Sequence, residues 1–306
     1  MHLNHGYRYQ ERVGASATPR TLLGYLAQTH RHSSRQEWAQ RIRRGEVALG
    51  ERVGQAEDRV CEGDEITWHR PPWVEPSVPR SCAILHRDTD VLVVAKPRGL
   101  PTVPAGGFLE NTLLALVREI DPDATPLHRL GRGTSGIVVF GRTRRARSSL
   151  SRAWRNGNVQ RFYRGLVEGV PGKSGFTVET PIGPVPHPVL GTVHGASNEP
   201  LARAARTDVR VIRTSSAGSL VEVEIKTGRP DQIRIHLASV NHRLLGDPLY
   251  GPGGTPRSDS RALPGEGGYW LHAERISFPH PLSGDETVVE CEPPPCLRGS
   301  VERART

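Results

Sequence analysis

The spacing of apolar positions near the N-terminus predicts two short helices. Residues 20–30 and 33–45 each carry apolar side chains at helical intervals. Ser34, with Glu37 three positions later, has the pattern of a capping box at the start of the second helix. Gly45 is placed to end that helix, because glycine readily adopts the left-handed backbone found just past helix ends.

The stretch after these helices predicts short strands and then a domain boundary. Residues 46–53 and 62–70 read as short strands around turns. A Pro-rich segment follows, so residues 73–81 are predicted to be a linker. The chain is therefore expected to contain a small domain, residues 1–72, and a large one, residues 82–306.

From Ala83 onward, short buried strands outnumber long helices and do not alternate with them regularly. Strands are predicted within residues 83–96 (two strands), 137–143, 161–169, 209–214, 218–227, 276–281 and 287–294. Helices are predicted at residues 111–120 and 143–157 and from residue 229. This order favours an α+β fold around a mixed, largely antiparallel sheet, joined to a small N-terminal α/β domain.

Composition narrows the class of protein. Hydrophobic residues make up 36% and charged residues 24% of the 306 positions, which is typical of a globular protein. No apolar run approaches the ~20 residues that cross a bilayer. The first residues also lack the apolar core of a signal peptide. We therefore expect a cytoplasmic protein that does not enter a membrane.

The charge is strongly positive and comes almost entirely from arginine. The net charge is +9, and lysine occurs only at Lys96, Lys173 and Lys226. Ten arginines and no Asp or Glu lie between Arg129 and Arg164. Such a run is either a solvated helix face or a strip that binds phosphates. Its length without an acidic residue favours the phosphate-binding strip and thus a polyanionic partner.

Familiar nucleotide and metal motifs are missing. The Gly-rich stretch of residues 128–143 lacks the Gly-Lys-Ser/Thr of a P-loop, and its G-x-G does not open a helix. The four cysteines include a CEPPPC pair at Cys291 and Cys296, but a zinc site needs four ligands and no second pair is near in the sequence. We expect reduced thiols, no metal and no cofactor.

Residues 18–70 resemble the alpha-L RNA-binding domain of ribosomal proteins and many RNA-modifying enzymes. The resemblance lies in a basic second helix followed by a G-x-V segment and a G-D-x-I strand. It implies that the helix arginines contact RNA: Arg35, Arg41, Arg43 and Arg44. The alternative is an ordinary helical cap on the larger domain.

Five segments of the large domain, in this order and spacing, resemble the RluA family of pseudouridine synthases. They are VLVVAKPRGLPTVP, HRLGRGTSGIVVFGRT, FYRGLVEG, TGRPDQIRIHLASVNHRLLGDPLYG and WLHAERISFPHPLSG. The resemblance covers about residues 82–290. It implies an RNA isomerase that detaches uracil from its ribose, turns the base and rejoins it through carbon, without cofactor or metal. The target base must leave its stack to be reached.

The resemblance also implies residue roles. Tyr163 matches the tyrosine that lies against the target base and is a candidate proton acceptor, and Arg234 matches the arginine that pairs with the catalytic carboxylate. Lys96 and Pro97 match the Lys-Pro of the early strand and loop. The catalytic loop is matched by His128, Arg129, Thr134, Ser135 and Gly136, and we expect Arg129 and Arg132 to contact RNA.

One position of the catalytic loop departs from the family pattern. The family's loop normally reads His-Arg-Leu-Asp-Arg, and its Asp is the catalytic nucleophile. Here that position is Gly131, which offers no oxygen to attack the sugar or base or to accept a proton. Losing such a group typically costs roughly 10⁴–10⁶ in rate.

A second departure suggests a replacement. The family usually has His before Gln-Ile-Arg, but this chain has Asp231. On a helix, Asp231 and Arg234 would lie three residues apart on one face, where the guanidinium would keep the carboxylate ionised. Asp231 is therefore a candidate for the missing carboxylate. The alternative, which we favour from the sequence, is that it only caps the helix.

Two functions from different classes follow. The first is an active RNA pseudouridine synthase acting on ribosomal or transfer RNA with an unusual catalytic loop. The second is a catalytically silent RNA-binding member that serves as an RNA chaperone or ribosome-assembly factor. An introduced substitution at Gly131 is a further possibility. We expect a monomer, and a mobile Gly/Pro-rich loop at residues 251–268 that helps to close over RNA.

Overall fold

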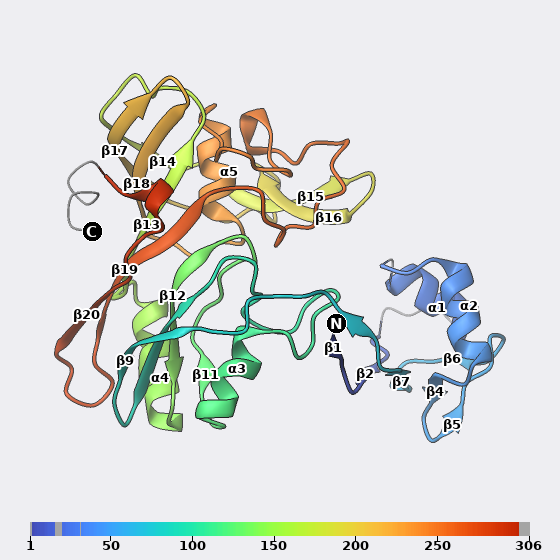
Figure 1. The fold of residues 1–306 in the computed structure, drawn as a ribbon. Coiled ribbons are helices and arrows are strands. Elements are labelled where there is room, and N and C mark those ends of the chain that lie inside the picture. Colours follow the sequence, from blue (N-terminus) through green and yellow to red (C-terminus); the bar gives the residue numbers. More distant parts are fainter. Residues whose placement is uncertain (1, 16–19, 31, 300–306) are drawn as a thin grey trace. The chain divides into compact units, whose positions relative to one another are not determined.

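The structure is a computed structural model that describes residues 2–15, 20–30 and 32–299 (Figure 1). Contacts divide the chain into two units, Met1–Ser77 and Val78–Thr306. The division falls inside the segment 73–81, which the sequence predicts as a linker. Part of that segment is regular structure, because β8 (Val74–Glu75) pairs with β1 (His2–Leu3).

The two predicted helices of the small unit are confirmed. They are α1 (Leu22–Thr29) and α2 (Arg35–Arg43). The capping box is also present: the Glu37 amide donates to the Ser34 hydroxyl, and the Ser34 amide donates to the Glu37 carboxylate. Gly45, with φ +72°, takes the left-handed backbone that ends α2.

Short strands pack beside these helices and complete a small core. One sheet has the order β2-β7-β4-β5, formed by β2 (Tyr7–Arg12), β7 (Glu65–Arg70), β4 (Val47–Leu49) and β5 (Arg52–Val53). A separate pair joins β3 (Arg20–Thr21) to β6 (Arg59–Val60). The core includes Leu22, Trp38 and Ile66, so apolar faces of both helices and the sheet meet there.

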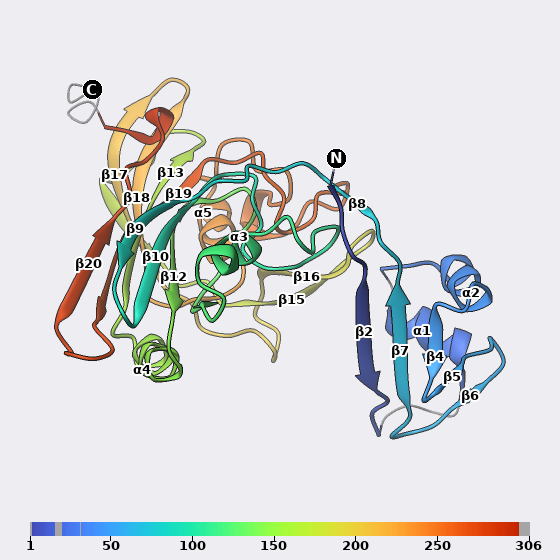
Figure 2. The ribbon, with the colours of Figure 1, turned by 60° about the horizontal axis from the view of Figure 1, so that its bottom comes forward.

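The large unit is built on one ten-stranded sheet, seen from two directions in Figures 1 and 2. Its main path is β14-β17-β18-β13-β19-β12-β10-β9, with β11 paired to β12 and β20 to β19. The strands are β9 (Ala83–Arg87), β10 (Val91–Lys96), β11 (Thr125–Pro126), β12 (Ser135–Gly141), β13 (Gln160–Val167), β14 (Gly175–Val178), β17 (Thr207–Ser215), β18 (Gly218–Ile225), β19 (Leu271–Pro279) and β20 (Glu286–Glu290). The predicted α+β class, with a mixed and largely antiparallel sheet, is confirmed.

One parallel pairing joins the two halves of this sheet. Ser135 and Gly136 of β12 pair with His272 and Ala273 of β19, whereas the other pairings of the sheet are antiparallel within the described residues. At Gly136, with φ +106°, a Cβ atom would lie 2.2 Å from the carbonyl oxygen of Ala273. Only glycine fits there. Because parallel strands start at the same end, the segments that lead into β12 and β19 are brought side by side.

Three helices flank the sheet. Thr112 caps α3 (Leu113–Ile120) and Thr143 caps α4 (Arg144–Arg155) through side-chain hydrogen bonds. The third helix, α5 (Gln232–Ser239), is buried along nearly its whole length. Among the described residues, no helix has both the length and the apolar character that crossing a membrane requires.

One hairpin was missed by the sequence reasoning. β15 (Ile182–His187) pairs with β16 (Gly191–Ala196) as a separate antiparallel ribbon. Pro184 and Pro186 lie within β15 and cannot donate to a ladder, so the segment does not read as a strand. This ribbon contacts α5, whose first turn belongs to the candidate site.

Candidate functional site

The loop of residues 128–134, the predicted catalytic loop, meets the 251–268 segment at the shared end of β12 and β19. The Gly133 amide donates to the carbonyl oxygen of Gly265 at 3.3 Å. The hydroxyls of Thr134 and Tyr269, both buried, are 3.1 Å apart. The segment predicted to be a mobile surface loop therefore packs directly against the loop that contains Gly131.

Gly131 leaves little room for a side chain. A Cβ atom built on it would lie 3.1 Å from Oη of Tyr269 and 3.9 Å from Oγ1 of Thr134. Its φ is outside the left-handed region, so backbone strain does not require glycine. A substitution here would need a shift of the Tyr269 hydroxyl by a few tenths of an ångström.

The segment after β10 holds the backbone on both sides of Gly131. Thr102, which is buried, donates its hydroxyl to the carbonyl oxygen of Leu130 at 2.9 Å and accepts the Leu130 amide at 3.1 Å. The Gly99 amide donates to the carbonyl oxygen of Arg132 at 2.7 Å. These three bonds fix the loop at the residues before and after position 131.

Arg234 is the centre of a buried ionic cluster. Its guanidinium binds Asp247 in a bidentate pair, with Nε–Oδ2 at 2.7 Å and Nη2–Oδ1 at 2.8 Å. Its Nη1 donates to Asp231 at 3.1 Å and also to the carbonyl oxygen of Pro264. The rings of Tyr250 and Tyr269 lie 4.8 and 4.4 Å from the guanidinium carbon, a cation–π arrangement.

The side chain of Asp231 faces this cluster and does not cap the helix. Asp231 occupies the N-cap position of α5, as the capping alternative predicted, but its side chain makes no capping hydrogen bond. Instead Oδ1 accepts from Arg234, and Oδ2 lies 3.3 Å from the Tyr250 hydroxyl. The side-chain part of the capping prediction is wrong.

The backbone of Asp231 is strained. Its φ of 51° and ψ of 21° lie in the left-handed region, which is uncommon for a residue with a side chain. Residues held in such regions cost roughly 1–3 kcal/mol and cluster at functional sites. Here the strained turn aims the carboxylate at Arg234.

Two carboxylates share the single Arg234 guanidinium, whereas burial has the largest effect on the pKa of Asp231. Asp247 already forms a bidentate pair and also accepts the amides of Leu249 and Tyr250. Burial raises the pKa of Asp231, the Arg234 guanidinium opposes this, and Asp247 adds to the rise. Asp231 is thus a carboxylate of raised basicity whose side chain remains 18% exposed.

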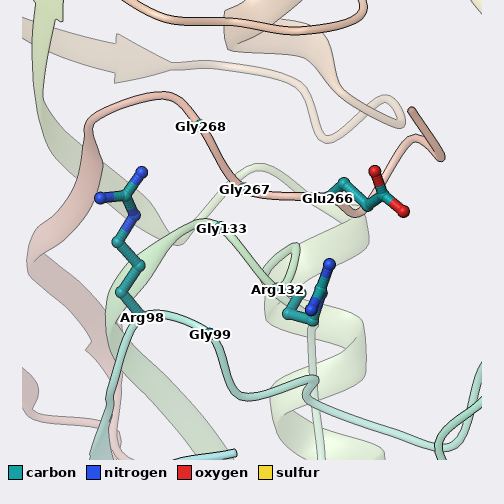
Figure 3. A pocket seen from close by; sticks show the side chains of 7 residues that line it. All are labelled: Arg98, Gly99, Arg132, Gly133, Glu266, Gly267 and Gly268. Atoms are coloured by element: carbon teal, nitrogen blue, oxygen red, sulfur yellow. The ribbon is translucent and has the colours of Figure 1, made fainter. Parts of the chain in front are cut away.

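A cavity of about 310 Å³ opens beside the catalytic loop (Figure 3). It is lined by Arg98, Gly99, Arg132, Gly133, Glu266, Gly267 and Gly268. Figure 3 shows Arg132 and Glu266 on one side of it and Arg98 on the other. Arg98 is held in place because it donates to the carbonyl oxygen of Tyr269 at 2.8 Å. The cavity combines two arginines suited to phosphate with a second carboxylate, Glu266.

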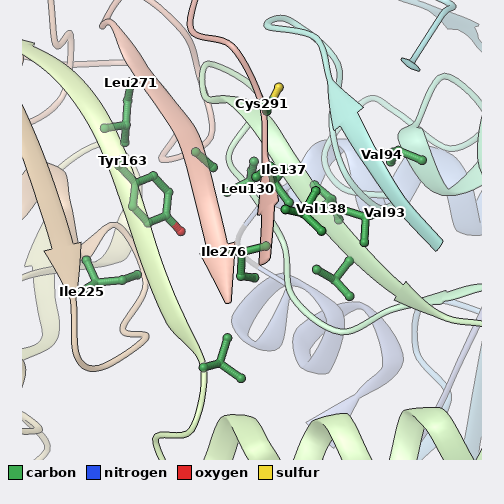
Figure 4. Packing of buried hydrophobic residues seen from close by; sticks show 14 of the residues in the cluster. Val93, Val94, Leu130, Ile137, Val138, Tyr163, Ile225, Leu271, Ile276 and Cys291 are labelled. Carbon is green, nitrogen blue, oxygen red and sulfur yellow. The ribbon is translucent and has the colours of Figure 1, made fainter. Parts of the chain in front are cut away.

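Tyr163 lies in the core beneath the loop. Its side chain is 6% exposed and packs in the cluster that contains Leu130, Ile233 and Leu271 (Figure 4). Burial raises the pKa of Tyr163, with Arg161 opposing the shift. The phenol therefore stays neutral near pH 7, where it offers a ring face and an O–H donor.

Comparisons with known proteins show which family this chain resembles. The family model described as RNA pseudouridylate synthase matches residues 90–239. An uncharacterized RNA pseudouridine synthase of Synechocystis is 40% identical over 261 residues, spanning 85% of this chain and 89% of that protein. RNA pseudouridine synthase 5 of Arabidopsis thaliana is 31% identical over 354 residues, spanning 98% of this chain and 96% of that protein.

This chain belongs to the RNA pseudouridine synthase family. It is an isomerase, and RNA is its partner. Ribosomal large subunit pseudouridine synthase D of Neisseria meningitidis is also similar, with 35% identity over 267 residues that span 83% of this chain and 70% of that protein. The fold agrees with human RNA pseudouridylate synthase domain containing 1, at a TM-score of 0.57 and 24% identity over 74% of this chain and 89% of that chain.

Other predicted pocket residues of the synthase face a different cavity. Lys96 and Ser135 line a second cavity of about 580 Å³ together with His272 and Cys291. Lys96 donates to the carbonyl oxygens of Pro97 and Leu100, and burial, aided by Arg132, lowers its pKa to about 7. Lys96 thus stabilises the turn after β10 through the backbone of Pro97 and Leu100.

His128 serves as a structural residue of the loop. The Val139 amide donates to its Nε2 at 3.1 Å, and its ring stacks on Trp154 at 5.3 Å. Burial lowers the pKa of His128 to about 3, so the ring is neutral and accepts this hydrogen bond. His128 therefore stabilises the loop and lines neither of the two cavities.

The predicted RNA-contacting arginines differ in exposure. Arg129, Arg35, Arg43 and Arg44 have exposed side chains, and Arg132 lines the first cavity. Arg41 is half-buried: it donates to the Ser33 hydroxyl and lies over the rings of Trp38 and Trp68. Arg41 therefore stabilises the small unit whether or not it contacts RNA.

Several site residues were missed by the sequence reasoning. Tyr269 contacts the loop and Glu266 lines the cavity, whereas Thr102, Arg98 and Asp247 were included only as parts of matched segments. The Arg234 pairing with Asp247 spans 13 positions, so helical spacing gives no indication of it. The three glycines at 265, 267 and 268 around Glu266 were the available indication of a close approach.

Proposed function

We propose that this synthase converts uridine to pseudouridine with the carboxylate of Asp231 in the role for which Gly131 has no side chain. The observation that carries the proposal is the pairing of Asp231 with Arg234 in place of a helix cap. Contacts link the two positions: Arg234 binds the Pro264 carbonyl and packs on Tyr269, whose hydroxyl lies next to Gly131. These contacts support the proposal that the carboxylate and the loop act in one site.

The isomerisation needs an anionic oxygen, and its product contains the same atoms as its substrate. The bond between uracil N1 and ribose C1′ breaks, the base turns, and C5 bonds to C1′. A proton leaves C5 and one is returned to N1. The Asp231 carboxylate, made more basic by burial, would attack the sugar or base or remove this proton. Arg234 orients it and stabilises its negative charge.

The target RNA follows from chemistry and relatives together. We propose a structured RNA, ribosomal or transfer RNA, because the similar Neisseria protein is named for the large ribosomal subunit. Arg132 and Arg98 would bind phosphates at the cavity. Residues 1–72 would act as an alpha-L RNA-binding domain, which their basic second helix and following strands support.

Tritium release from RNA labelled at C5 of uridine tests the proposal. The wild-type chain, Asp231→Asn and Glu266→Gln would be compared on total ribosomal and transfer RNA. We expect wild type to release tritium and Asp231→Asn to lose at least about 10³-fold in kcat. Glu266→Gln is the matched control: it removes the carboxylate that lines the cavity, and we expect it to stay within about tenfold of wild type.

Thermal unfolding shows whether these variants still fold. Burial raises the pKa of Asp231 on folding, so at neutral pH its ionised form reduces stability. Asp231→Asn should thus unfold at or above the wild-type temperature. Release by Asp231→Asn at the wild-type rate, or loss only in Glu266→Gln, would contradict the proposal. Release by Gly131→Asp but not by wild type would mean a silent RNA-binding protein.

A further inference from the structure

One face of the β2–β7 pair in the small unit carries a row of aromatic rings. In the register of these strands Tyr7 lies opposite Arg70 and Tyr9 lies opposite Trp68, so the four side chains share a face. Tyr7 and Tyr9 have ring centroids 4.7 Å apart, and Tyr9 stacks on Trp68 at 5.2 Å with an interplanar angle of 18°. We call Tyr7, Tyr9 and Trp68 the aromatic row.

The aromatic row extends from the hydrophobic core to the surface of the small unit, where part of its ring area is exposed to solvent. Ile66, on the same face of β7, is 3% exposed and belongs to the core, and Trp68 is half-buried. Tyr9 is 41% exposed and Tyr7 48% exposed. Trp68 thus packs against the hydrophobic core, whereas Tyr7 and Tyr9 remain exposed to solvent.

Arginines lie on these rings. The guanidinium carbon of Arg41 is 4.3 Å from the Trp68 ring centroid and 4.5 Å from that of Trp38. Arg70 lies 3.4 Å from the Trp73 ring and 5.8 Å from the Trp68 ring. Aromatic faces beside guanidinium groups are the chemistry that binds unpaired bases and their phosphates.

The charge of the small unit indicates how it would bind RNA. Residues 1–77 contain 11 arginines, no lysine and 10 Asp or Glu, so nearly all of the chain's net charge of +9 lies in residues 78–306. Bulk electrostatic attraction in the small unit is therefore weak. Beyond the basic second helix, an RNA contact there gains from a contribution that does not depend on net charge, and base stacking supplies one.

We propose that the aromatic row is a stacking platform for single-stranded RNA, with unpaired bases on the rings of Tyr7 and Tyr9. Arg70, beside Tyr7, would contact a neighbouring phosphate or stack on a base. The small unit then holds an unpaired segment of the substrate. The proposal needs RNA as partner but does not depend on Asp231 as the catalytic carboxylate.

Fluorescence anisotropy with a short labelled single-stranded RNA tests the platform on the full chain. Tyr7→Leu with Tyr9→Leu keeps apolar strand residues but removes the rings, and we expect affinity to fall about tenfold or more. Tyr7→Phe with Tyr9→Phe keeps the rings and should bind as wild type does. The dependence of affinity on salt should stay the same in all three, because no phosphate contact is removed.

Three results would overturn the platform. The leucine pair could bind single-stranded RNA as tightly as wild type. The phenylalanine pair could lose as much as the leucine pair, which would assign the effect to the hydroxyls. Equal loss on duplex RNA would assign it to the backbone or to a protein contact. Asp231→Asn should bind this RNA like wild type, so a failure of the catalytic proposal is told apart from a failure of the platform.

Discussion

Asp231 shows how one residue can acquire the properties that a catalytic carboxylate needs. Arg234 gives Asp247 two hydrogen bonds and Asp231 one, so a single hydrogen bond from the guanidinium stabilises the ionised form of Asp231. Burial and the Asp247 charge then raise the pKa of Asp231. Tyr250 opposes this rise, because its O–H donates to the ionised form.

The pH dependence of the rate follows from this arrangement. As the catalytic carboxylate that we propose, Asp231 would act only when ionised, so kcat/KM should fall as the pH drops through its pKa, which lies above the ordinary value of 3.8. Tyr250→Phe removes the O–H donor and raises this pKa further. We expect the acid limb of the pH–rate profile to move to higher pH in Tyr250→Phe, with activity retained on the plateau. An unmoved limb would show that another group controls it.

At the scale of elements, the site depends on how two segments hold one loop. The turn after β10 binds the loop backbone through Thr102 and Gly99, and the segment before β19 binds it through Gly265 and Tyr269. The parallel pairing of β12 with β19 sets both segments at the same end of the sheet. The loop is therefore fixed from two sides, although its own sequence is rich in glycine.

Thr102→Val tests the importance of this support. The change keeps the shape of the side chain but leaves the amide and carbonyl of Leu130 without their buried partner, a cost of about 1–3 kcal/mol of folding stability. We expect kcat to fall about tenfold because the site loses its geometry. KM for RNA should change little, since the phosphate-binding arginines are untouched.

Thr102→Ser is the matched control for this prediction. Serine keeps the hydroxyl that bonds the amide and the carbonyl of Leu130. The kcat of Thr102→Ser should therefore be close to that of wild type, even if the lost methyl group lowers stability. Steady-state kinetics and thermal unfolding of both variants separate the two effects. Equal loss of kcat in the serine and valine variants would contradict the positioning role of the hydroxyl.

The sequence predicts local features of these elements better than their assembly. The α2 capping box, the β17–β18 hairpin and the Asp231–Arg234 spacing depend on residues close in the chain, and all are present. The β12–β19 pairing and the Arg234–Asp247 pair join distant segments, so no local pattern indicates them. The capping prediction for Asp231 failed because its side chain binds Arg234, one turn along the helix, and Tyr250 instead of the helix amides.

Across the whole molecule, the two units differ in charge and in the surface that we propose each offers to RNA. Residues 78–306 carry nearly all of the net positive charge and the cavity with Arg98 and Arg132. Residues 1–77 are close to neutral and offer the aromatic row. Family membership establishes an RNA isomerase, while the expectations of a monomer and of a cytoplasmic location stay predictions.

Returning the carboxylate to the loop tests the central claim most directly. Gly131→Asp would be added to Asp231→Asn in a Tyr269→Phe background, which removes the hydroxyl 3.1 Å from the new Cβ. Tritium release from C5-labelled RNA is the measurement. If Asp231 supplies the missing carboxylate, Asp231→Asn is inactive in this background and adding Gly131→Asp restores release. Full release by Asp231→Asn without Gly131→Asp would contradict the account.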